Sequence, residues 1–128
     1  MKKLLALIGL IPFATEADVV DQLLAETTAK LNKHIPLQVD EETRLDGVSA
    51  ENKTLIYEYT LLNYEKAELN LEILKSNIAP VVKKGACTEA SMKPLFDSGI
   101  NVHYHYKGKH GESLMMIKVI SSDCKNEI

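Results

Sequence analysis

The sequence predicts an α+β fold in which helices pack on one face of an antiparallel sheet of about four strands. Two segments repeat apolar residues with a helical period, and four others are typical of β-strands. The predicted order is helix, two strands, two helices, two strands, or α-β-β-α-α-β-β. The composition, 45% hydrophobic and 26% charged, is that of an ordinary globular protein.

Residues 1–17 have the three parts of a secretory signal peptide. Lys2 and Lys3 precede an apolar run from Leu4 to Phe13, and small residues end at Ala17. The apolar run is about ten residues long, whereas a helix needs ~20 to cross a bilayer. We therefore expect cleavage near Ala17, a periplasmic or secreted protein without a stable membrane span, and one domain over 18–128. The alternative is a first core helix of a cytoplasmic protein.

The first helix is predicted from Asp18 to Ile35, because its apolar residues follow a 3.6-residue period and Pro36 stops it. A strand follows over 37–45, where apolar and polar residues alternate. Asp46 and Gly47 predict either a turn or a bulge, and residues 51–53 give a second turn signal. Residues 54–62 are rich in β-branched and aromatic residues and predict a second strand, antiparallel to the first.

The second half repeats this change of period. After Asn63 the apolar residues return to a helical period, and Gly85 suits the end of this predicted helix. Pro80 should kink the helix or mark its last turn. Thr88 can cap a short helix that Gly99 ends. Strands over 100–107 and 112–121 are joined by the glycine-rich hairpin signal at 108–111.

Two cysteines, Cys87 and Cys124, lie in the predicted mature chain. An even count in an exported protein predicts one disulfide. Two buried free thiols are the alternative. A redox-active pair has less support, because the two residues do not form a C-x-x-C motif.

His103, His105 and His110 are the candidate metal ligands, because three imidazoles in eight residues resemble a zinc or copper site. On a strand, His103 and His105 point to the same sheet face, and a solvated polar face is the simpler explanation for them. Val102, Tyr104 and Tyr106 would then face the core. Neither a nearby cysteine nor an acidic residue at ligand spacing completes the ligand set, so we expect no cofactor.

Asp40, Glu41 and Glu42 are the candidate protein-binding residues, since an acidic run can attract a basic partner. Such runs are also common on solvated surfaces. Catalytic residues are not predicted: Ser91, Ser98 and Ser113 have histidines near them in the chain, but no nucleophile elbow of the G-x-S-x-G type is present. The formal net charge of −3 argues against a nucleic-acid partner.

The two Tyr-x-Tyr pairs, residues 57–59 and 104–106, predict aromatic stacking across the sheet. Together with Pro80, Cys87, residues 95–99, Gly111 and Cys124, they give a Cys…Gly…Tyr-x-Tyr…Gly…Cys pattern. In this pattern the chain resembles a group of small, mostly uncharacterised exported bacterial proteins. The resemblance covers structural residues, so it implies the fold and the disulfide but no catalytic residue.

These observations favour a non-enzymatic periplasmic protein that binds another periplasmic or secreted protein. An immunity protein that blocks a periplasm-acting toxin is the first hypothesis. An assembly factor or chaperone of an envelope secretion system is the alternative. A periplasmic metal-binding protein or enzyme that uses His103, His105 and His110 is a hypothesis of a different class, and a homo-oligomer is compatible with all of them.

Overall fold

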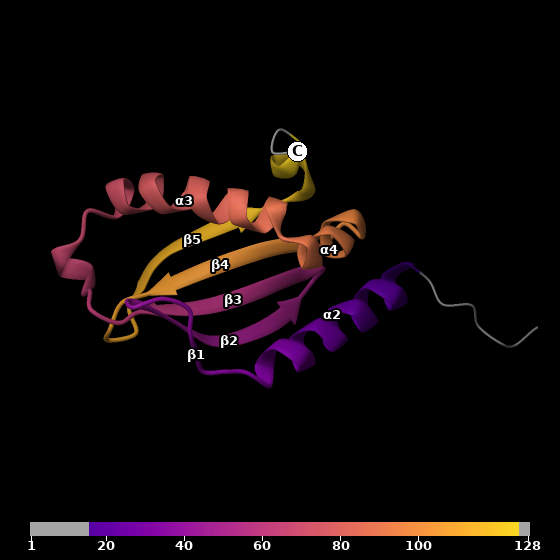
Figure 1. Cartoon of the computed structure of the whole chain (residues 1–128), viewed down its shortest axis with the longest axis horizontal. Coiled ribbons are helices and arrows are strands. Elements are labelled where there is room, and N and C mark those ends of the chain that lie inside the picture. The colour runs from indigo at the N-terminus through magenta and orange to yellow at the C-terminus, as the bar shows by residue number, and fades with distance from the viewer. Residues whose placement is uncertain (1–15, 126–128) are drawn as a thin grey trace, which may run out of the picture.

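The structure, a computed structural model, describes residues 16–125 and shows helices arranged along a twisted sheet (Figure 1). The predicted signal peptide therefore lies almost entirely outside the described residues. The elements are α2 (Glu16–Asn32), β1 (Leu37–Gln38), β2 (Thr43–Glu51), β3 (Thr54–Leu61), η1 (Lys66–Glu68), α3 (Leu71–Thr88), η2 (Ala90–Met92), α4 (Lys93–Asp97), β4 (Asn101–Lys107), β5 (Ser113–Val119) and η3 (Ser121–Cys124). Within the described part of the chain, no helix is both long and apolar enough to cross a membrane.

The α+β class is confirmed, but the sheet has five strands and is mixed rather than antiparallel. Its order is β1-β2-β3-β4-β5, and β3 pairs with β4 in parallel. The reason is the long connection through α3 and α4. It carries the chain back along the sheet, so β4 starts at the same end as β3.

The fifth strand appears because the predicted strand over 37–45 breaks in its middle. The amides of Val39 and Asp40 both donate to the Thr43 carbonyl, and the Asp40 carboxylate accepts from the Glu42 amide at 2.8 Å. These bonds form a tight turn, after which β2 folds back on β1 and pairs Leu37 with Leu45.

Of the two possibilities at Asp46 and Gly47, the structure has the bulge. Leu45 pairs with Tyr59 and Gly47 with Glu58, which leaves Asp46 as the extra residue. The turn predicted at 51–53 is confirmed, with Asn52 and Lys53 both at positive φ as a tight hairpin requires.

The two faces of the sheet differ in composition. The covered face lies under the helices, and the polar face is the opposite one. As predicted, Val102, Tyr104 and Tyr106 are buried on the covered face, whereas His103 and His105 point to the polar face. The core of the covered face consists of Leu45, Val48, Leu55, Tyr57, Val102, Tyr104, Tyr106, Ile117 and Val119.

Helix boundaries differ from the prediction in both long helices. The first ends at Asn32 rather than Ile35, because the Asn32 side chain bonds to both the amide and the carbonyl of Val48 in β2. The other, α3, continues past Gly85 to Thr88, and Pro80 lies within it. Thr88 does not cap the next helix, since its hydroxyl donates back to the Lys84 carbonyl.

The disulfide between Cys87 and Cys124 is confirmed. It joins the last turn of α3 to η3, across a sequence separation of 37 and a Cα–Cα distance of 5.0 Å. The bond therefore ties the end of the chain to the helix that covers the sheet.

Candidate functional site

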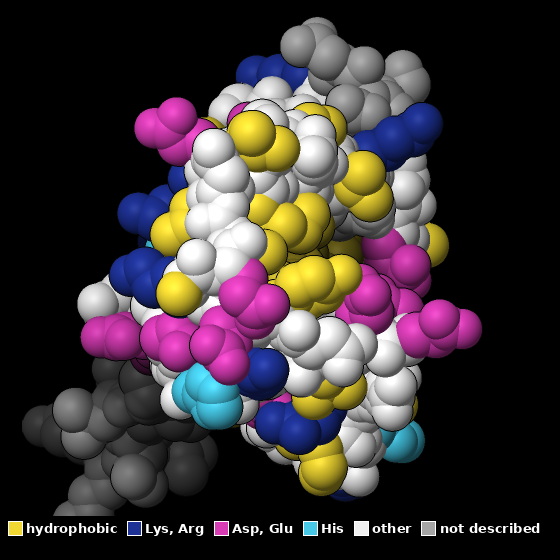
Figure 2. Space-filling model, turned by 90° about the vertical axis from the view of Figure 1, so that its left-hand side faces the viewer, with side chains coloured by type: hydrophobic (Ala, Val, Ile, Leu, Met, Phe, Trp, Pro, Cys, Tyr) yellow, Lys and Arg dark blue, Asp and Glu magenta, His cyan; other side chains and the backbone are white. Residues whose placement is uncertain are grey.

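The main candidate site is an apolar groove of about 590 Å³ between α3 and the sheet. Figure 2 looks at this end of the molecule and shows apolar side chains in a central hollow, with acidic side chains on both sides. The groove is lined by Thr43, Leu61, Tyr64, Leu69, Leu74 and Ile78, with Asp40, Glu41 and Glu42 at its rim.

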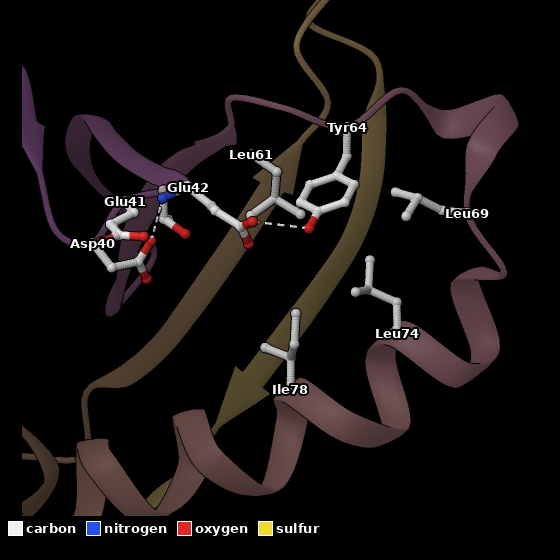
Figure 3. Close-up of a pocket in the computed structure, with 9 residues that line it drawn as sticks. Asp40, Glu41, Glu42, Leu61, Tyr64, Leu69, Leu74 and Ile78 are labelled. Carbon is white, nitrogen blue, oxygen red and sulfur yellow. Dashed lines mark hydrogen bonds between the residues drawn. The ribbon is translucent and has the colours of Figure 1, made fainter.

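Three distant segments of the chain build this groove (Figure 3). Leu74 and Ile78 lie one helical turn apart on α3 and point toward Tyr64, while Leu61 rises from the end of β3. The acidic rim comes from the turn between β1 and β2. The groove is thus a product of tertiary structure.

Hydrogen bonds fix the rim. The Tyr64 hydroxyl donates to the Glu42 carboxylate at 3.0 Å, which raises the pKa of the tyrosine. The backbone amide of Glu42 donates to Asp40 and lowers the pKa of that carboxyl group, so Asp40 stays charged at neutral pH. The rim therefore presents negative charge beside an apolar surface.

The β4–β5 hairpin holds the segment after β3 that carries Tyr64, which lines the groove. The Lys109 amide donates to the Tyr64 carbonyl at 2.8 Å, and Glu65 forms ion pairs with Lys109 at 3.2 Å and His110 at 3.1 Å. Hydrogen bonds from His110 and Lys109 lower the pKa of Glu65. His110 thus serves as a contact between the hairpin and the segment after β3.

A second, shallower cavity of about 310 Å³, here the tyrosine trough, lies farther along α3. Its floor is the predicted aromatic stack: Tyr57 lies 5.2 Å from Tyr104, and Tyr59 lies 5.0 Å from Tyr106, between ring centroids. Val82 and Ala86 form its wall. Since Leu74, Ile78, Val82 and Ala86 are spaced four residues apart, one face of α3 lines both the groove and the trough.

The acidic residues predicted from the sequence lie at the main candidate site. Asp40, Glu41 and Glu42 lie at the rim of the groove. The sequence did not predict the apolar residues that line the groove beside them. From the sequence, Leu74 and Ile78 were predicted only as apolar residues of a helix face. A helical period does not show whether such a face is buried or lines an open groove.

The three histidines do not converge. His103 and His105 share the polar face, and His105 bonds to Glu58, whereas His110 contacts Glu65 in the hairpin turn. Across residues 16–125, no three His, Cys, Asp or Glu side chains are grouped so that they could hold a metal ion.

The fold and the groove define a small α+β protein with an open apolar groove between α3 and the sheet. The chain belongs to the family described as a domain of unknown function (DUF8479), whose model matches residues 18–115. Comparison with curated proteins finds no match.

Solved structures share the fold at low sequence identity. A Pseudomonas aeruginosa protein classed as secreted (PA3611) is 14% identical, with a TM-score of 0.73 over 89% of this chain and 100% of its own. The pilotin EpsS of the Vibrio vulnificus type 2 secretion system is 10% identical, with a TM-score of 0.67 over 86% and 96%. The type II secretion pilotin AspS of Vibrio cholerae is 14% identical, with a TM-score of 0.63 over 85% and 95%.

Proposed function

We propose that this protein is an accessory factor of an envelope secretion system that binds an amphipathic segment of another subunit in the apolar groove. The observation that carries the proposal is the groove itself, which has apolar walls beside an acidic rim. The shared fold with two pilotins supports the assembly-factor alternative better than the toxin-immunity hypothesis, for which the comparisons offer no relative.

The charge of the groove, and the length of the α3 face that lines both the groove and the adjoining tyrosine trough, specify the segment. From Leu74 to Ala86 the lining face of α3 extends about 18 Å, at 1.5 Å per residue, which is long enough to pack against about three turns of a helix. An apolar stripe at i, i+3 or i+4, and i+7 would fit this wall. Basic residues at one end would meet Asp40, Glu41 and Glu42.

A pair of α3 variants tests the site. Ile78→Asp places a charge in the groove, and Val81→Asp places the same charge on the outer side of α3, where Val81 is 71% exposed. We expect Ile78→Asp to weaken partner binding at least about 30-fold, since central apolar contacts in interfaces contribute 2 kcal/mol or more. Secretion-channel assembly in the envelope should fail in that variant alone. Circular dichroism checks that both variants fold.

A photo-crosslinking amino acid at the same two kinds of position, inside the groove and on the outer side of α3, identifies the partner. Placed at Leu74, it should capture a secretion-system subunit, and placed at Val81 it should not. Normal secretion and assembly in a folded Ile78→Asp variant, or capture of a toxin at Leu74, would reject the proposed function.

Charge reversal tests the rim separately. Lysines at Asp40, Glu41 and Glu42 should slow association by about tenfold at low salt and reduce its salt dependence, because charged rims act mainly on the association rate. Stability should change little, since these side chains are exposed. Unchanged association kinetics would mean that the acidic rim takes no part in binding and that only the apolar groove does.

A further inference from the structure

Three polar side chains on the polar face form a continuous hydrogen-bonded row. His105 Nδ1 lies 2.6 Å from a carboxylate oxygen of Glu58, and His105 Nε2 lies 2.8 Å from the Ser113 hydroxyl. The residues come from three adjacent strands, β3, β4 and β5. This row is a serine, an imidazole and a carboxylate in the order that acyl-transfer enzymes use.

A β-bulge brings the serine onto this face. Tyr106 pairs with Met115, but Lys107 pairs with Ser113, so Leu114 is an extra residue in β5. In a regular ladder Lys107 would face Leu114, and Ser113 would point to the covered face. Bulges commonly redirect a side chain beside a functional site, and this one places the Ser113 hydroxyl against His105.

The hydrogen bonds also set the proton positions. A carboxylate can only accept, so Glu58 accepts a hydrogen bond from Nδ1–H of His105, and the tautomer that serves as a base carries no proton on Nε2. The lone pair of Nε2 then faces the Ser113 hydroxyl, which donates to it. In this arrangement the Glu58 carboxylate orients the His105 base, and the base is bonded to the exposed Ser113 hydroxyl. Such an arrangement activates a serine.

A cation lies at the carboxylate end of the row. The Lys107 ammonium group is 3.9 Å from the same Glu58 oxygen that lies beside His105 Nδ1. Lys107 is also the cross-strand partner of Ser113 at the bulge, so its backbone lies beside the serine.

We propose that Ser113 is a nucleophile for acyl transfer, that His105 is its general base, and that Glu58 is the positioning residue. Ser113 Oγ attacks the carbonyl carbon of a small activated ester while its proton passes to His105 Nε2. The Oγ–carbon bond forms, the bond from carbon to the alkoxy oxygen breaks, and His105 returns the proton to the departing alcohol. Water then cleaves the acyl-serine by the reverse proton path. The inference is independent of the apolar groove, which lies on the covered face.

The test is covalent labelling of the purified protein with a fluorophosphonate, in which the Oγ–phosphorus bond forms and fluoride leaves. Peptide mass spectrometry should find one phosphonyl group on Ser113. Ser113→Ala should lose it, and His105→Gln should slow labelling by about a hundredfold, the usual contribution of a general base. Glu58→Gln should have a smaller effect, of about tenfold, because the amide oxygen still accepts from Nδ1.

His103→Gln is the matched control, because His103 shares the strand and the face of His105 but has Lys118 opposite it rather than a carboxylate. It should label at the wild-type rate, and so should the exposed Ser98→Ala variant. The proposal is overturned if Ser113 is not labelled, or if folded His105→Gln labels as fast as the wild type. Retention of secretion by Ser113→Ala would leave the proposed function intact, so the two ideas can fail separately.

Discussion

The covered face and the polar face are made by the same strands, yet they provide different chemistry. In β4, Val102, Tyr104 and Tyr106 point into the core, and the residues between them face away from it. The covered face is apolar and is open along α3 at the groove and the tyrosine trough. The polar face instead contains hydrogen-bonded groups, such as Asp46 with Thr60 and Arg44. A two-residue period is therefore enough to separate an apolar face from a polar one.

The polar face also holds its charge differently. Burial opposes ionisation of Asp46, but hydrogen bonds from Thr60 and Arg44 outweigh it and lower the pKa of this carboxyl group. On the same face, burial and then the charge of Lys118 lower the pKa of His103, which favours its neutral form. Each group on this face is thus governed by its local partners.

The largest expected difference between the faces is in stability. Tyr104→Ala removes a buried ring from the aromatic stack and should lower the free energy of unfolding by about 4 kcal/mol. His103→Ala, one residue earlier but on the other face, should cost about 1 kcal/mol or less. Urea unfolding of the two variants makes the comparison, and equal losses would mean that the polar face is a second core.

The next effect concerns the link between the covering helix and the end of the chain. Cys87→Ser removes a bond that closes 37 residues, which should cost about 3.8 kcal/mol in the loop-entropy model. Thermal unfolding with and without reductant checks this, since reductant should destabilise the wild type and leave the variant unchanged. No response of the wild type to reductant would contradict the expectation.

The effect that is smallest per residue appears at high pH. Burial raises the pKa of Tyr57 and of Tyr106 to about 12, and it also raises the pKa of Tyr59 and Tyr104. Because the folded state binds these protons more tightly, their contribution is complete below about pH 10, the unfolded value, and is lost as the pH rises toward 12. Each of the first two tyrosines should lose on the order of 2 kcal/mol.

Ultraviolet titration follows the ionisation of the five tyrosines directly. We expect the core tyrosines to ionise together with unfolding, whereas Tyr64 at the groove rim should respond to Glu42→Gln, which removes the charged acceptor that raises its pKa. Separate, gradual ionisation of the core tyrosines in a folded protein would show that the stack is open to solvent.

Sequence patterns correctly predicted the features that depend on neighbouring residues in the chain. The alternation in residues 100–107 placed tyrosines inward and histidines outward, because successive side chains on a strand point to opposite faces. The hairpin at 108–111 and the turn at 51–53 followed from their own residues. The cysteine count gave the disulfide through the expected oxidising compartment.

Other features depend on partners that are distant in sequence. The parallel pairing of β3 and β4 is decided by how α3 crosses the sheet, and the end of α2 by a contact from Asn32 to Val48. The same holds for the site. Asp40 and Ile78 line the same groove only once α3 has packed on the sheet, and Glu58 lies beside His105 only once the strands are in register.

The parallel junction between β3 and β4 has a consequence for how the protein is made. The floor of the tyrosine trough combines Tyr57 and Tyr59 from the first hairpin with Tyr104 and Tyr106 from the second, and the wall comes from the crossover between them. A nascent or clipped chain that lacks either hairpin therefore has no complete floor for this trough. The trough is complete only after synthesis has passed β4 and the crossover has closed over the sheet.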